Sequence, residues 1–227
     1  MADVVVFSKK FAIFAFDMIH IETHPADSPL TGQSKWWGEP DMPEELDWPE
    51  VTVTDEDGET YDDPLTFVCQ IRCEDIAALD EEGLLPHEGM LYFFAALDYF
   101  LGDIDTPLYP GMGQWQQEYF RVLYSSACDD LHTHHVVNPD GTPANLPAEA
   151  ITFTKCSRHD DGQRLLGLPY IIEVSEQMPD YLSLLQIDEC ARWNLVFHDS
   201  GTLNFLIRPD DLRQRRWDKT ECYLYSF

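Results

Sequence analysis

The side chains best suited to metal chemistry lie together in the stretch Cys128-Asp129-Asp130-Leu131-His132-Thr133-His134-His135. Thiolate, carboxylate and imidazole groups are ligands that zinc and other borderline metals accept. The spacing of Cys128, His132 and His134 fits no established zinc signature, and adjacent histidines are common in solvated loops. We therefore predict that this stretch holds no metal and that the protein carries no cofactor.

Motifs that would identify an enzyme are missing from the sequence. The phosphate-binding patterns GxGxxG and GxxxxGK[ST] do not occur, and neither do the nucleophile elbow GxSxG and the zinc motif HExxH. The carboxylates are too numerous and too evenly spread for sequence alone to select a catalytic pair. We predict no catalytic residues, and the sequence favours a non-enzymatic protein over an enzyme.

Two glutamines, Gln70 and Gln186, interrupt apolar stretches that predict buried strands. A buried amide without partners costs about 1–3 kcal/mol, so each must be hydrogen-bonded. One hypothesis is that each bonds the backbone of a neighbouring Gly-x-Pro loop. The other is that both line a shared pocket together with Trp36 and Trp37. Those tryptophans precede Gly38, where they would either close an edge of the core or, if exposed, anchor a partner.

The charge of the chain is strongly negative and unevenly distributed. The formal net charge is −28, and residues 1–150 carry 5 basic and 30 acidic side chains, against 9 and 12 in residues 151–227. Such a field repels nucleic acid and anionic membranes and attracts basic proteins, although acidity can also serve solubility alone. We predict a basic protein partner, contacted by a strip of carboxylates in a proline-rich loop: Glu39, Asp41, Glu44, Glu45 and Asp47.

Internal repetition determines the expected architecture. Four short stretches recur in the same order, which predicts two structural units in one globular domain spanning residues 1–227. The units are expected at about residues 7–126 and 150–227, and a hairpin at 51–63 is an insertion in the first. The matching pairs are 34–40 with 163–169, 66–71 with 182–187, 89–94 with 201–206, and 123–125 with 224–226.

The local patterns predict strands joined by short helices. Apolar stretches indicate strands at Phe11–Ile21, Leu65–Ile71 and Met90–Leu97, and a short helix is expected at Cys73–Leu79. A loop is expected from Thr23 to Pro49, which holds five prolines. The predicted fold class is α+β and strand-rich, with mostly antiparallel strands in two tandem pseudo-repeats.

The order of these motifs resembles the YwqG-like family of bacterial domains of unknown function. The resemblance rests on Ser34-Lys35, Gly38, Pro40-Asp41, Gln70-Ile71, Glu88-Gly89, Leu91-Tyr92-Phe93-Phe94, Gly167, Pro169, Gln186-Ile187 and Gly201-x-Leu203-x-Phe205. It covers nearly the whole chain and implies a bacterial protein with an α+β fold. It transfers no catalytic residues.

The remaining features predict a cytosolic protein. The N-terminus lacks the pattern of a signal peptide, and no apolar run is long enough to span a bilayer. The six scattered cysteines then read as free thiols. Two functions stay open: a binding module that holds a basic partner on its acidic face, as toxin-neutralising proteins do, or an enzyme or small-ligand-binding protein with a pocket between the units.

Overall fold

The computed structural model describes residues 18–54, 57–138 and 141–227. The first predicted strand, Phe11–Ile21, therefore lies outside the described residues up to position 17, as does the predicted start of the first unit at position 7. From Met18 onward the predicted strand continues as β1, which ends at Pro25.

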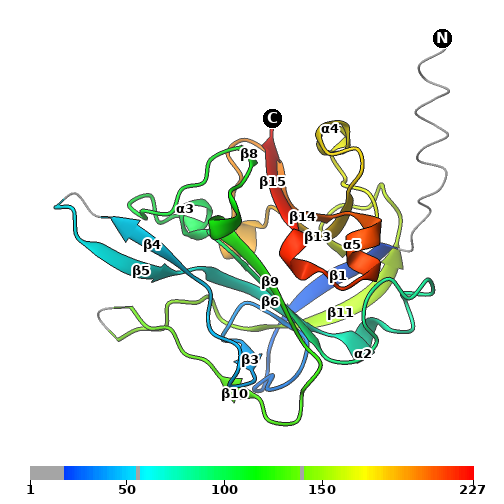
Figure 1. The fold of residues 1–227 in the computed structure, drawn as a ribbon, viewed down its shortest axis with the longest axis horizontal. Helices are drawn as coiled ribbons and strands as arrows, with labels where there is room; N and C mark the ends of the chain where they lie inside the picture. Colours follow the sequence, from blue (N-terminus) through cyan, green and yellow to red (C-terminus); the bar gives the residue numbers. More distant parts are fainter. Residues whose placement is uncertain (1–17, 55–56, 139–140) are drawn as a thin grey trace.

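A single curled antiparallel sheet of eleven strands forms the body of the molecule (Figure 1). Its spatial order is β8-β15-β14-β13-β12-β1-β11-β2-β6-β7-β9. In chain order these strands are β1 (Met18–Pro25), β2 (Lys35–Trp36), β6 (Thr66–Arg72), β7 (Met90–Ala95), β8 (Gly113–Gln114), β9 (Phe120–Ser125), β11 (Glu149–Cys156), β12 (Gln163–Leu165), β13 (Leu182–Asp188), β14 (Gly201–Ile207) and β15 (Glu221–Ser226).

Helices contribute little to the described fold. The four α-helices are α2 (Cys73–Ile76), α3 (Asp98–Leu101), α4 (Ile172–Gln177) and α5 (Pro209–Arg213). The described residues also form three 3-10 helices of three residues each: η1 (Gln117–Tyr119), η2 (Ala191–Trp193) and η3 (Trp217–Lys219). None of the α-helices described exceeds six residues, so none can cover a face of the sheet. The prediction of an α+β class was therefore wrong. The fold is closer to all-β, because the sheet buries its apolar residues by curling on itself.

The two halves of the sheet exchange their first strands. β1 precedes β2 in the chain but pairs with β12, whereas β11 precedes β12 but pairs with β2. At the centre β1 and β11 pair with each other along their whole length, from Met18 opposite Cys156 to Pro25 opposite Glu149. Each half therefore completes the other, and the backbone hydrogen bonds of the sheet run without interruption between them.

One apolar core fills the inside of the curl, and two smaller clusters lie on the outside. The main core contains the buried side chains of both halves, such as Phe93 from β7 and Phe205 from β14, whose ring centroids are 5.4 Å apart. On the outer face of β6 and β7, a second cluster gathers Phe67, Tyr92 and Phe94. Strands buried on both faces are expected to be mainly apolar, as β7 is, whereas β14 also buries Thr202 and Asn204, which are hydrogen-bonded to each other.

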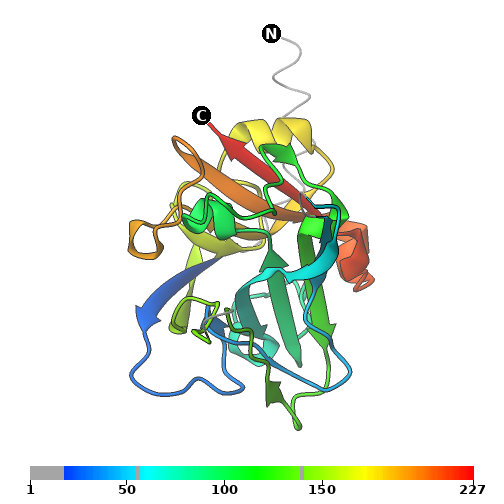
Figure 2. The same cartoon turned by 90° about the vertical axis from the view of Figure 1, so that its left-hand side faces the viewer.

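Shorter elements cover the outer face of the first half. β4 (Glu50–Thr54) and β5 (Thr60–Pro64) form the hairpin that projects from the body in Figures 1 and 2, over the stretch that the sequence marks as an insertion. β3 (Asp41–Met42) pairs with β10 (His132–Thr133), so the loop expected from Thr23 to Pro49 contains β2 and β3 and the end of β1. No helix in the described part of the chain is long and apolar enough to span a membrane.

Candidate functional site

The two glutamines singled out in the sequence occupy corresponding places in the two halves. Gln70 on β6 lies opposite Lys35, and Gln186 on β13 lies opposite Arg164. The Gln70 side chain accepts a hydrogen bond from the Asp41 N–H at 2.8 Å and donates to the Gln33 carbonyl at 2.8 Å.

Gln186 repeats this arrangement in the second half. Its side chain accepts from the Tyr170 N–H at 2.8 Å and donates to the Gly162 carbonyl at 3.3 Å. Asp41 and Tyr170 each follow a Gly-x-Pro sequence by one residue. Each glutamine thus bonds the backbone of its own Gly-x-Pro loop, and every hydrogen-bonding group of its amide finds a partner within its own half of the sheet.

A buried ion pair accompanies Gln70. Lys35 Nζ lies 2.8 Å from a carboxylate oxygen of Asp41, and the two residues are 5% and 0% exposed. The same oxygen accepts from the Gly32 N–H, and the other accepts from the Thr133 hydroxyl at 2.7 Å. Burial raises the pKa of Asp41, but the bonds from Lys35, Thr133 and Gly32 outweigh it and hold the pKa below its ordinary value. Asp41 is therefore a structural anion inside the fold.

In the second half, the buried cation Arg164 has different partners. Arg164, which is 2% exposed, donates to Gln186 at 2.7 Å and to the Arg158 carbonyl at 3.0 Å. Its guanidinium lies 5.6 Å from the centre of the Tyr170 ring, which stands where Asp41 stands in the first half. A cation–π contact and carbonyl acceptors thus replace the carboxylate.

The predicted pocket residues Trp36 and Trp37 lie inside the core. They are 0% and 1% exposed, and both pack against Trp193 from η2, with ring centroids 5.5 Å and 5.3 Å away. Trp37 has a φ of +55°, as Leu166 at the corresponding place has +62°, which turns each chain sharply into its Gly-x-Pro loop. These tryptophans join the two halves, and neither they nor the two glutamines line the clefts described below.

The stretch from Cys128 to His135 does not come together as a ligand set. His132 faces Asp130 at 3.6 Å, and His135 faces Glu39 at 2.7 Å. Within residues 18–54, 57–138 and 141–227, no group of three or more His, Cys, Asp or Glu side chains is arranged to hold a metal ion. All six cysteines carry free thiols.

The predicted acidic strip is split between the interior and the surface. Glu44, Glu45 and Asp47 are exposed, Glu39 is half-buried against His135, and Asp41 is fully buried in its ion pair. Asp41 is therefore not available to a partner. The strip that a partner can reach consists of Glu44, Glu45 and Asp47, with Glu39 at its edge.

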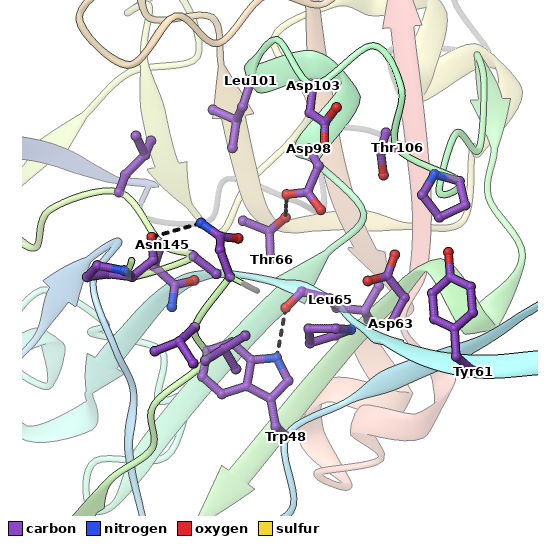
Figure 3. A pocket seen from close by; sticks show the side chains of 18 of the residues that line it. Trp48, Tyr61, Asp63, Leu65, Thr66, Asp98, Leu101, Asp103, Thr106 and Asn145 are labelled. Carbon is purple, nitrogen blue, oxygen red and sulfur yellow. Dashed lines mark hydrogen bonds between the residues drawn. The ribbon is translucent and has the colours of Figure 1, made fainter. Parts of the chain in front are cut away.

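A cleft of about 600 Å³ lies at the end of this strip, next to Trp48 (Figure 3). Three carboxylates line it, from Asp63 on β5, Asp98 on α3 and Asp103 just after α3. The rings of Trp48 and Tyr61 form a further part of the wall. The described lining residues include no Lys, Arg or His, so nothing in that wall neutralises the carboxylates.

Local structure determines where these side chains point. The Trp48 indole N–H donates to the Leu65 carbonyl at 2.8 Å, and its ring packs against Phe94 at 5.4 Å, which fixes the floor of the cleft. Helix α3 ends at Gly102, whose φ of +110° suits glycine. This ending lets the Asp103 N–H bond the Asp98 carbonyl at 2.9 Å and so brings two acidic residues to one place.

Both Asp63 and Asp98 hold their protons more tightly than ordinary carboxyl groups. Burial raises the pKa of Asp63, and the charges of Asp98 and Asp103 raise it further. Burial also raises the pKa of Asp98, against the lowering effect of a 2.7 Å hydrogen bond from the Thr66 hydroxyl. The negative charges of Asp98 and Asp103 thus disfavour the charged form of Asp63, and a bound cation would counter this effect.

Comparison with known proteins identifies a family but no function. A family model described as a domain of unknown function, DUF1963, matches residues 34–225. The chain belongs to this family. No curated protein matched the sequence. The DUF1963 match covers Gln70, Gln186 and all the described residues that line the acidic cleft, whereas the finer YwqG-like resemblance stays a prediction.

Sequence reasoning missed the cleft of this DUF1963 domain. Asp63 lies in the hairpin that the sequence predicts at 51–63, and nothing in the sequence distinguishes Asp98 and Asp103 from the other carboxylates. One signal was available, because the sequence contains no Lys or Arg between Trp36 and Ile71. That stretch supplies Trp48, Tyr61 and Asp63 to the cleft.

Proposed function

We propose that this DUF1963 domain is a non-enzymatic binding module whose acidic cleft receives a basic side chain of a protein partner. The observation that carries the proposal is a cleft of about 600 Å³ whose wall holds three aspartates and two aromatic rings and no cationic side chain. A cavity of this size suits an organic group and not a lone ion. A basic toxin that the module neutralises is one such partner.

The chemistry of the wall matches an ammonium or a guanidinium group. Carboxylates form charge-assisted hydrogen bonds with Arg and Lys, and an Arg can engage one carboxylate through two parallel bonds. The faces of Trp48 and Tyr61 attract the same cations through their π electrons. A cation also relieves the repulsion that Asp98 and Asp103 exert on Asp63.

The exposed strip and the cleft play different roles in this proposal. Glu44, Glu45 and Asp47 precede Trp48 directly in the chain, so the strip leads to the floor of the cleft. Exposed charges chiefly accelerate encounter, whereas buried charge pairs chiefly slow dissociation. The strip therefore steers a basic partner, and the cleft retains it. The same negative field argues against nucleic acid and anionic membranes as partners, and a cytosolic location stays a prediction.

Much of the site comes from residues that the two halves do not share. The cleft is lined by Tyr61, Asp63 and Pro64 from β5 and by residues 136–138 and 143–147, none of which belongs to the repeated stretches of the sequence, whereas Thr66 does. An enzyme or small-ligand site between the units was the alternative. The side-chain amides of Gln70 and Gln186 form hydrogen bonds with the surrounding backbone and do not need a ligand. This favours the acidic cleft as the functional site.

Binding kinetics of a ten-residue peptide of alternating arginine and glycine test the proposal. Asp63→Asn with Asp98→Asn should raise the dissociation rate at least about 30-fold, since truncating one partner of a buried charge pair costs about 2 kcal/mol or more. Glu44→Gln with Glu45→Gln changes the net charge equally and should slow association with little effect on dissociation. The association rate constant should fall as the salt concentration rises from 0.01 M to 0.15 M, because the Debye length falls from about 30 Å to about 8 Å.

The paired variants make the result decisive because their net charges are equal. If both double variants weaken binding to the same extent and in the same rate constant, the peptide responds to net charge alone. The cleft would then have no special role, and the proposal would be wrong.

A further inference from the structure

A second cleft of about 520 Å³ adjoins the acidic one. The two share part of their walls, namely Pro143, Asn145, Leu146 and Pro147. The chain from Glu39 to Trp48 also begins in the wall of the second cleft and ends in the wall of the first. Two neighbouring hollows divided by one stretch of chain suit a ligand that extends across both.

The second cleft offers mainly apolar surface to such a ligand. Its polar side chains largely satisfy one another, because Lys35 and Thr133 both bond Asp41, and Glu39 pairs with His135 outside the wall. What remains for a ligand are Thr31, the Nδ2 group of Asn145, which has no hydrogen-bond partner among the described residues, and a larger set of apolar side chains: Pro29, Leu30, Pro143, Leu146, Pro147 and Ala148. A wall of this kind selects an apolar group.

We propose that the two clefts together bind an extended segment of the basic partner, with an arginine or lysine in the acidic cleft and an apolar side chain in the second. This inference rests on the proposed function, because the acidic cleft must hold the cation. Charge complementarity orients the segment, and the shared wall sets a short separation between its basic and its apolar residue. A free polyamine would use only the first cleft.

The test compares soluble peptides on the unaltered protein by calorimetry. Each ten-residue peptide carries one arginine and, one to four positions away, either leucine or serine, in a background of glycine and serine. At the best spacing the leucine peptide should bind about 10-fold more tightly than its serine counterpart, since burying a leucine contributes that much or more.

Two surface variants test whether the tighter binding of the leucine peptide arises in the second cleft. Leu30→Ser removes an apolar side chain from the second cleft and should reduce the leucine advantage to less than about 3-fold while leaving the serine peptide unaffected. Ile172→Ser, which removes a side chain that is 51% exposed outside both walls, should leave the advantage intact.

The outcomes separate this inference from the proposed function. Equal binding of leucine and serine peptides at every spacing overturns the extended-segment inference, while their shared sensitivity to Asp63→Asn with Asp98→Asn would still support the acidic cleft. Spermidine binding as tightly as the best leucine peptide also overturns it, in favour of a small polycation. Failure of every peptide to bind would overturn both.

Discussion

Removing the positive charge of Lys35 should destabilise the fold severely. Lys35→Met keeps most of the side-chain volume but leaves the carboxylate of Asp41 buried without its cation, which lies 2.8 Å away in the native protein. Removing one partner of a buried ion pair destabilises a protein by about 3–5 kcal/mol. Asp41 keeps its bonds from Gly32, Thr133 and Gln70, so the lower end of that range, about 3 kcal/mol, is expected.

Urea unfolding followed by tryptophan fluorescence measures this loss, because Trp36, Trp37 and Trp193 are all buried in one cluster. Typical domains are stable by only about 5–15 kcal/mol, so the shift in midpoint should be large. Arg213→Met is the matched control: it breaks the exposed pair with Asp210 and should cost less than about 0.5 kcal/mol.

The effect should also depend on pH with a definite sign. The pKa of Asp41 is lowered in the folded protein, so its contribution is complete above the ordinary carboxyl pKa of 3.8 and is lost as the pH falls through the folded value. In Lys35→Met a buried, uncompensated Asp41 can take up a proton. The penalty should therefore be largest near neutral pH and shrink in acid. A Lys35→Met protein no less stable than Arg213→Met would refute the reasoning.

Three further results follow from the same contacts. Asp63→Asn should raise the urea midpoint at neutral pH. The pKa of Asp63 is raised in the folded protein, so the stability of the wild-type protein falls as the pH rises through that folded pKa. Equal urea midpoints for the variant and the wild-type protein would contradict this prediction. Gln70→Leu and Gln186→Leu should each cost about 1–3 kcal/mol in urea unfolding, and a neutral substitution at either would show that its amide bonds are dispensable. Residues 149–227 expressed alone should lack sheet structure by circular dichroism, because the outer partner of β12 is β1.

Much of the strand pattern could be predicted from sequence, because buried strands leave continuous apolar stretches. Leu65–Ile71 and Met90–Leu97 correspond to β6 and β7, and the expected helix at Cys73–Leu79 is present as a shorter α2. The exchange of β1 and β11 could not be predicted, since local periodicity does not say which distant strand completes a ladder. The predicted fold class was wrong for a related reason: the short helices were expected, but local periodicity does not show that none of them covers a face of the sheet.

The candidate site was harder to foresee than the sheet. Among the acids of the loop after β2, only the structure shows that Asp41 faces the buried Lys35 while Glu44 faces solvent. The cleft combines Asp63 from the hairpin, Asp98 from α3 and residues 136–138 and 143–147, which lie far apart in the chain. No spacing rule connects such residues, because loop closure brings them together.

The most direct test of the central claim is to titrate the cleft carboxyl groups with and without a cation. Carbon-13 NMR of the Asp63 and Asp98 side chains gives each pKa separately, and exposed Asp47 serves as the reference. If a basic side chain sits among these groups, saturation with the arginine–glycine peptide should lower the pKa of Asp63 and Asp98 more than that of Asp47. Unchanged pKa values at Asp63 and Asp98 in the saturated protein would place the cation elsewhere and contradict the account.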